Sequence, residues 1–154
     1  MKKILYIVII ALLVFLFACQ DKNNVKQDDD TKDEKISEKY GEIDIDLASM
    51  SGTIAYSQVY DMINSPEKYE GKVVKMRGQF SAFYSKTTKL YYPAVIIQDA
   101  TACCSKGIEF VLDGNPDYPA AYPKTGKTVT VVGIFEIYYE NGDRYCHLVN
   151  AIVL

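Results

Sequence analysis

Tryptophan is absent from this 154-residue chain, and histidine occurs once, at His147. The four cysteines form no C-x-x-C pair, so the usual motif of thiol–disulfide oxidoreductases is missing. A catalytic cysteine needs a base within hydrogen-bond reach and a third group that orients the base. No motif in the chain supplies that third group. We therefore expect a protein that is not an enzyme.

The sequence also lacks an apolar run of about 20 residues, the length that a transmembrane helix requires. A shorter apolar run covers residues 4–18, follows two lysines and ends at Cys19. This layout is typical of an export signal. Its ending, Leu-Phe-Ala-Cys, resembles the lipobox of bacterial lipoproteins, which implies cleavage after residue 18 and acylation of Cys19. We expect a lipid-anchored protein on the extracytoplasmic face of the cell membrane.

Charge is concentrated in residues 20–46, which carry ten acidic and five lysine side chains. Such a segment buries too little apolar surface to offset its conformational entropy. We therefore expect a lipidated cysteine and disordered acidic tether over residues 19–50, and one folded domain over residues 51–154. The folded part has equal numbers of acidic and basic residues and follows the acidic tether, so no nucleic-acid partner is expected. The expected partners are the membrane, a metal ion, and a membrane or envelope protein.

Apolar and polar residues alternate through most of the folded part, which is typical of half-buried strands. Mid-strand glycines, Gly78 and Gly133, indicate bends or bulges in two of these strands. Asn141-Gly142 predicts a tight hairpin between the last two strands. The expected strands cover residues 72–84, 90–98, 108–112, 127–139 and 144–154.

A short helix capped by Ser57 is expected to run to about Asn64 and to end before Pro66. Together these elements predict a mainly β fold, a small five-stranded antiparallel barrel of the oligonucleotide/oligosaccharide-binding (OB) type with one short N-terminal helix. A β-sandwich is the alternative.

The three cysteines that remain after Cys19 are Cys103, Cys104 and Cys146. One hypothesis is a structural disulfide from Cys103 or Cys104 to Cys146, favoured by oxidising surroundings. Another is a metal site made by these cysteines and His147, since three sulfurs and one nitrogen suit zinc or another soft ion. Adjacent strand residues point to opposite faces, so this site requires a bulge at residues 146–147 and a turn at the vicinal pair.

A proline-rich loop over residues 113–126 contains Tyr118 and Tyr122. Long irregular loops are often functional, and tyrosines stack on sugars or peptides while their hydroxyl groups stay in water. These two tyrosines are candidate ligand-binding residues. The alternative is that they only cover the rim of the barrel.

Several segments of the domain resemble the extracytoplasmic C-terminal domain of a family of bacterial permease subunits. The segments are residues 64–72, the strand around Gly78, the vicinal cysteines, and the strand at residues 129–133. The resemblance implies an OB-like fold and a link with metal handling. Because the membrane helices of those subunits are lacking here, only a binding role carries over.

The sequence therefore predicts a membrane-anchored lipoprotein that acts as a non-enzymatic binding module, with a zinc-like ion held by its cysteines. The alternative function is a carbohydrate- or protein-binding accessory lipoprotein with a structural disulfide.

Overall fold

The computed structural model describes residues 27–154, with side chains from residue 34 onward. The predicted signal peptide (residues 1–18) and the acylated Cys19 lie outside the described residues. The chain divides into two units, residues 1–35 and 36–154, and the second unit contains the β-sheet. Within residues 27–154 no helix combines the length and the apolar composition needed to cross a bilayer.

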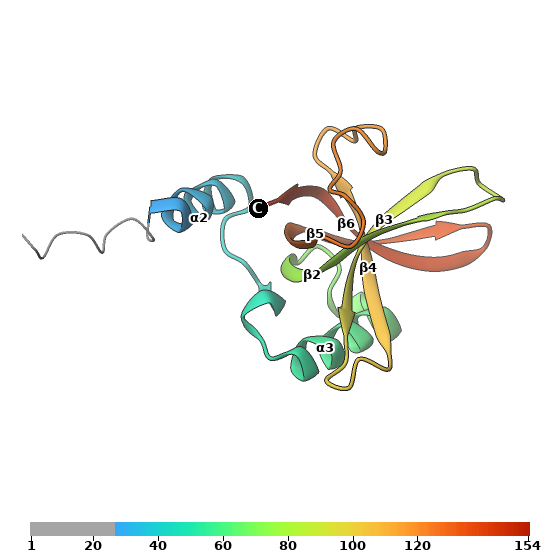
Figure 1. Cartoon of the computed structure of the whole chain (residues 1–154), viewed down its shortest axis with the longest axis horizontal. Helices are drawn as coiled ribbons and strands as arrows, with labels where there is room; N and C mark the ends of the chain where they lie inside the picture. Colours follow the sequence, from blue (N-terminus) through green and yellow to red (C-terminus); the bar gives the residue numbers. More distant parts are fainter. Residues whose placement is uncertain (1–26) are drawn as a thin grey trace, which may run out of the picture. The chain divides into compact units, whose positions relative to one another are not determined.

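Five long strands build the second unit: β2 (Val73–Tyr84), β3 (Tyr91–Gln98), β4 (Ser105–Leu112), β5 (Thr128–Glu140) and β6 (Asp143–Val153). They pair in the order β2-β3-β4-β6-β5, and β2 also pairs with β5, so the pairing closes into a ring. Figure 1 shows these strands gathered around one centre. The predicted mainly β, OB-like fold is confirmed.

One pairing differs from the expected antiparallel barrel, because β4 and β6 run parallel. Strands β2, β3 and β4 form a meander, so β2 and β4 point the same way. The loop after β4 brings β5 antiparallel to β2, and the hairpin at residues 141–142 returns the chain as β6 between β5 and β4. The direction of β6 therefore matches that of β4.

The backbone confirms one sequence signal for the sheet, the hairpin, and gives Gly78 a different role from the predicted bend or bulge. Asn141 and Gly142 have φ angles of +53° and +90°, as a tight hairpin with left-handed residues requires. A Cβ atom on Gly78 would lie 2.3 Å from the carbonyl oxygen of Ile96, so only glycine allows β2 and β3 to approach this closely.

The barrel interior is filled by side chains from every long strand, and the helix α3 (Gly52–Asn64) packs on it. The six largest fully buried side chains are Phe80, Phe110, Phe135, Leu47, Met62 and Met76. In Figure 1, α3 lies on the same side of the barrel as the loop between β3 and β4. The contacts of α3 with these two strands agree with that placement.

Helix α3 begins earlier than the sequence prediction that used Ser57 as its cap. The residue before its first turn is Ser51, whose backbone is extended. Ala55, Val59 and Met62 are buried at spacings of four and three residues, so one continuous face of the longer helix packs on the barrel. The helix ends at Asn64, before Pro66, as predicted.

The expected disorder of the acidic segment is wrong from about residue 36 onward. Helix α2 (Gln27–Tyr40) is followed by the short elements β1 (Ile45–Asp46) and η1 (Leu47–Ser49). Ile36 and Leu47 are each only 2% exposed. The Tyr40 hydroxyl group donates a hydrogen bond to the carbonyl oxygen of Asn150. A few apolar residues between the charges are therefore enough to hold residues 36–49 on the barrel.

Replacing Ile36 with alanine is expected to lower the free energy of unfolding by about 2 kcal/mol, because the side chain packs with Val73 and Val132 in a small cluster. Chemical denaturation of the full chain measures this loss. Ile54→Ala is the matched control, because Ile54 is 58% exposed and should cost little. Equal effects of the two changes would contradict the packing of residue 36.

Candidate metal centre

The loop of residues 99–104 joins β3 to β4, whose end residues Gln98 and Ser105 pair with each other. The Asp99 N–H donates to the Cys104 carbonyl oxygen, and the Ala102 N–H donates to the Asp99 carbonyl oxygen, each at 3.0 Å. Ala102 has a φ of +55°, in the left-handed region. This reversal folds Cys103 and Cys104 back over Asp99.

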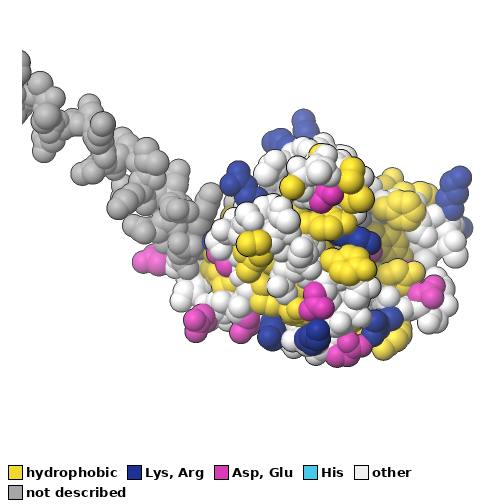
Figure 2. Space-filling view, turned by 90° about the horizontal axis from the view of Figure 1, so that it is seen from below, with side chains coloured by type: hydrophobic (Ala, Val, Ile, Leu, Met, Phe, Trp, Pro, Cys, Tyr) yellow, Lys and Arg dark blue, Asp and Glu magenta, His cyan; other side chains and the backbone are white. Residues whose placement is uncertain are grey.

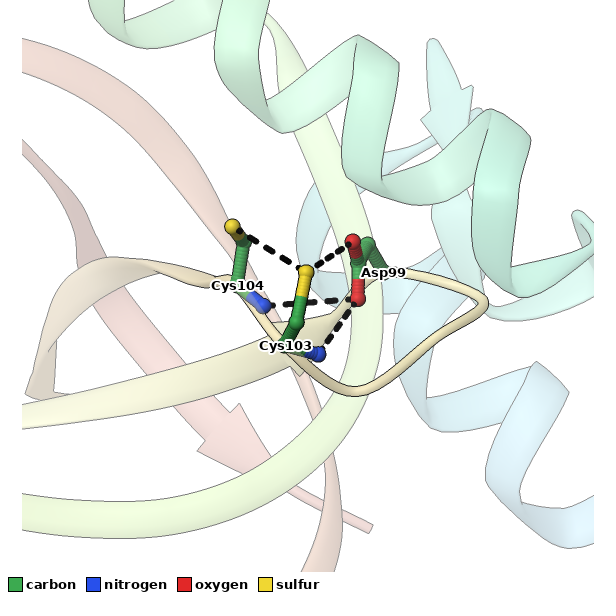
Figure 3. A group of neighbouring side chains, drawn as sticks. All are labelled: Asp99, Cys103 and Cys104. Atoms are coloured by element: carbon green, nitrogen blue, oxygen red, sulfur yellow. Dashed lines mark hydrogen bonds between the residues drawn. The ribbon is translucent and has the colours of Figure 1, made fainter.

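The Asp99 carboxylate organises the loop with one oxygen. Its Oδ1 accepts from the backbone N–H of Cys103 at 3.0 Å and from that of Cys104 at 3.4 Å. Its Oδ2 lies 3.4 Å from Cys103 Sγ and 3.0 Å from the Thr101 hydroxyl oxygen. Figure 3 shows the Cys103 sulfur between this carboxylate and the Cys104 sulfur.

Desolvation acts to raise the pKa of Asp99, but hydrogen bonds from Thr101, Cys103 and Cys104 outweigh it and hold this pKa below its usual value. The carboxylate is therefore negatively charged at neutral pH.

The two vicinal sulfurs lie on the same side of the loop, with Cys103 Sγ and Cys104 Sγ 3.5 Å apart. Neighbours on a regular strand would point to opposite faces, so the turn relieves the difficulty foreseen from the sequence. Both side chains are exposed free thiols. The hydrogen bond from Cys103, followed by the charge of that residue, raises the pKa of the Cys104 thiol.

Asp99, Cys103 and Cys104 bring one ligand atom each to within 4.8 Å of the others. For a tetrahedral ion with Zn–S and Zn–O bonds of about 2.3 Å and 2.0 Å, the S–S and S–O edges are about 3.8 Å and 3.5 Å. Two edges, 3.5 Å between the sulfurs and 3.4 Å from Cys103 Sγ to the carboxylate, lie close to these lengths, and the third, from Cys104 Sγ to the carboxylate, is within 4.8 Å. Two of the three edges therefore match such a site.

Asp99 is a candidate ligand that the site predicted from the sequence did not contain. Its signal was present, because an aspartate that precedes a tight turn commonly accepts hydrogen bonds from backbone N–H groups a few residues further on. This hydrogen-bonding pattern places the carboxylate against the residues that follow the turn, which here are the two cysteines.

Cys146 and His147 lie elsewhere, so the predicted four-ligand centre is not formed. His147 on β6 is opposite Glu109 on the parallel strand β4, which puts Cys146 level with Ile108. Four residues of extended chain separate Ile108 from Cys104, a distance of about 13 Å. Cys146 is also a free thiol, so the predicted disulfide to the vicinal pair is not formed either.

The surroundings of Cys146 and His147 are those of a structural cluster. Burial and then the charge of Glu109 raise the pKa of Cys146 to about 11. The His147 ring stacks on Tyr138 at 4.5 Å between centroids, and its buried Nε2 has no hydrogen-bond partner among the described residues. Burial lowers the pKa of His147, so the ring is neutral at pH 7.

Glu109 is the carboxylate of this cluster, and it accepts a hydrogen bond from the Tyr138 hydroxyl at 2.6 Å. Burial raises the pKa of Glu109 despite that bond. The folded state therefore holds the proton more tightly than the unfolded state, and stability is lost as pH rises above the usual glutamate pKa.

Glu109→Gln is expected to remove this loss of stability at rising pH. The free energy of unfolding of the variant should therefore fall less than that of the wild type between about pH 4 and about pH 7. Denaturation curves at several pH values measure it. The exposed Glu38→Gln serves as control. A pH dependence unchanged by Glu109→Gln would contradict the assignment.

The candidate ligand-binding residues Tyr118 and Tyr122 pack against the barrel instead of extending into solvent. Tyr122 packs against Phe80 and Phe110 with ring centroids 6.3 Å and 5.7 Å apart. Its hydroxyl oxygen lies 3.4 Å from the backbone N–H of Leu112. Both tyrosines are half-buried and pack on the core cluster, so covering the barrel rim accounts for their contacts.

Outward from Tyr118 the aromatic contacts continue to the surface. The ring of Tyr118 lies 4.4 Å from that of Tyr91, which lies 4.9 Å from that of Tyr84. Tyr84 and Tyr91 are 44% and 48% exposed. Figure 2 shows a broad hydrophobic area on the side toward which the hairpins extend. Other exposed hydrophobic residues of these hairpins are Phe83, Leu90, Tyr139 and Tyr145.

Comparison with known proteins identifies no family for this chain. No protein-family model matches it, and no curated protein matches it. One similar solved structure is described as a "putative nucleic acid-binding lipoprotein" from Klebsiella pneumoniae, with 23% identity over 68% of this chain and 79% of that chain. Its TM-score is 0.35, too low to support conclusions about this chain. The resemblance to permease subunits receives no support from these comparisons.

The description of that structure conflicts with the expectation of no nucleic-acid partner, and the exclusion is withdrawn. It depended on net charge alone. The net charge of a domain reports its average electrostatic potential and does not describe a local surface, so it was too weak a ground for excluding a class of ligand.

Proposed function

We propose that this chain is a membrane-anchored extracytoplasmic lipoprotein and a non-enzymatic binding module whose ligand is a zinc-like metal ion. The export signal and the lipobox-like ending at Cys19 support the anchor, because acyl chains hold a protein on a membrane at about 0.8 kcal/mol per buried methylene. The ion is bound by Asp99, Cys103 and Cys104.

The observation that carries the metal proposal is the cluster of three ligand atoms within 4.8 Å of one another, in which two of the edges match those of a zinc tetrahedron. The two oxygens of the Asp99 carboxylate also have different partners. Oδ1 of Asp99 accepts the backbone N–H groups of both cysteines, which fixes the turn, and Oδ2 faces Cys103 Sγ. The ligand set is thus largely preorganised.

The chemistry of the donors favours zinc over the hard cations. Two thiolates are soft ligands, and one carboxylate adds a third negative charge, a combination that suits Zn²⁺ rather than Mg²⁺ or Ca²⁺. Both thiols must lose their protons to bind the ion. Because the pKa of Cys104 is raised, protons compete well for this site and affinity should fall on acidification.

The direct test is zinc binding by the mature full-length protein, purified without oxygen and titrated with zinc against a chromophoric chelator. We expect one zinc ion per chain, with affinity that decreases steadily from about pH 8 to about pH 6 as the thiolates take up protons. A protein that binds no zinc at either pH would refute the proposal.

Asp99→Asn is the sharpest single change for the carboxylate. Asparagine retains an oxygen that can accept the two backbone N–H groups, so the turn should persist, but it removes the negative charge at Oδ2. We expect about a tenfold loss of zinc affinity with little change in stability. Thr101→Ser, which retains the hydroxyl group beside Asp99, is the control. Equal affinity of Asp99→Asn and wild type would remove Asp99 from the site.

A second candidate function is carbohydrate binding at the exposed aromatic surface. The observation that favours it is the contact of the exposed rings of Tyr84 and Tyr91, which present faces on which a sugar can stack. Retention of the Tyr91→Ala variant on envelope polysaccharide, compared with wild type, tests this function independently of zinc.

A further inference from the structure

We propose that the centre at Asp99, Cys103 and Cys104 is a transfer site, which passes its ion to an acceptor by ligand exchange rather than holding it permanently. The acceptor is a molecule with a thiolate, imidazole or carboxylate ligand that enters the coordination sphere before the ion leaves. This inference depends on the proposed zinc binding and extends it.

Exposure of the sulfurs is the first observation. Cys103 and Cys104 are both exposed, in contrast to the half-buried Cys146. Structural zinc sites are closed by four protein ligands, whereas sites that exchange a ligand keep one position accessible. Within residues 34–154 no further histidine, cysteine, aspartate or glutamate brings a ligand atom into this group.

The origin of the ligands is the second observation. All three come from one loop, which Figure 3 shows between two strands and beside α3. The loop is closed by its own hydrogen bonds, while Gln98 and Ser105 pair at its base. Loss or gain of the ion therefore requires no separation of β3 from β4, so exchange can be fast without opening the barrel.

Thr101 marks a position from which an additional ligand can reach the ion. Its hydroxyl oxygen lies 3.0 Å from Asp99 Oδ2 and 3.1 Å from Cys103 Sγ, beside two of the three ligand atoms. A neutral threonine hydroxyl is a poor ligand for zinc. A stronger donor at this place would complete a closed tetrahedral set.

The exchange step conserves charge and electrons. The entering ligand forms a bond to the ion as the bond to one cysteine sulfur breaks, and the other protein ligands then leave in turn. Each released thiolate takes one proton from water or buffer. The oxidation states of zinc and sulfur do not change.

The test uses mature full-length protein loaded with one zinc ion and mixed with 4-(2-pyridylazo)resorcinol as acceptor, over a tenfold range of chelator concentration. Entry of the acceptor before release predicts that the observed transfer rate rises about tenfold over this range. A rate that is independent of chelator concentration would overturn the proposal while leaving zinc binding intact. Failure to load zinc would refute the proposed function itself.

Thr101→Cys is the companion variant, because the new thiolate would supply a fourth ligand. We expect it to bind one zinc ion and to transfer it at least tenfold more slowly than wild type. Thr101→Ser, which adds no strong ligand, should transfer at the wild-type rate. Equal rates for Thr101→Cys and Thr101→Ser, with zinc bound in both, would also overturn the proposal.

Discussion

Replacing both Cys103 and Cys104 with serine is expected to lower the zinc affinity of the mature protein by at least about 100-fold. Loss of residues that only orient a metal ligand already costs about 10-fold to 100-fold, and this change removes two ligands. Serine retains nearly the same volume but its hydroxyl group does not ionise at neutral pH. Competition with a chromophoric chelator under anaerobic conditions measures the loss.

The matched control is Cys146→Ser, which removes the same chemical group from β6. Cys146 is half-buried, has a pKa raised to about 11 and lies at the level of Ile108. Zinc affinity should therefore change less than threefold. If Cys146→Ser weakened zinc binding as much as the double change, the loop would not be the centre.

Gly78→Ala is expected to lower the free energy of unfolding by about 3 kcal/mol, at the upper end of the range for overpacking a tight site. The added Cβ would lie 2.3 Å from the Ile96 carbonyl oxygen and 2.9 Å from a methyl group of Val95. Strand β3 would have to move away from β2. Because the centre follows directly after β3, zinc affinity should fall as well.

Gly52→Ala provides the control for this stability measurement. No atom lies within 4 Å of the Cβ position at Gly52, and its φ is not in the left-handed region. Gly52 is the first residue of α3, where alanine is compatible with the helix, so the change should be neutral or stabilising. A loss at Gly78 no larger than that at Gly52 would refute the close approach of β2 and β3.

Much of the fold follows from local patterns. The alternation of residues 72–84 and 127–139 predicted two long strands, and Asn141-Gly142 predicted the hairpin that joins β5 to β6. These signals are local because side-chain period and turn conformation depend only on nearby residues. The acidic segment was harder to interpret, because Ile36 is buried through contacts with Val73 and Val132, which are distant in the sequence.

Only part of the candidate metal site could be predicted from the local sequence. The vicinal cysteines were evident, and the turn that brings their sulfurs together could be anticipated. Their third partner could be chosen only by knowing which residues meet. The sequence offered Cys146 and His147 because they are the remaining soft or titratable side chains, whereas the structure places Asp99, which is already in the loop, beside the two thiols.

The amino-acid sequence by itself determined the strand-forming segments and the pair of thiols in one turn, because each depends on a short stretch of chain. The tertiary structure alone decided that β6 runs parallel to β4 and sets Cys146 beside Ile108. Strand order and register are properties of the whole packed barrel. They fix which distant side chains are neighbours, and here they leave the vicinal thiols with the aspartate of their own loop.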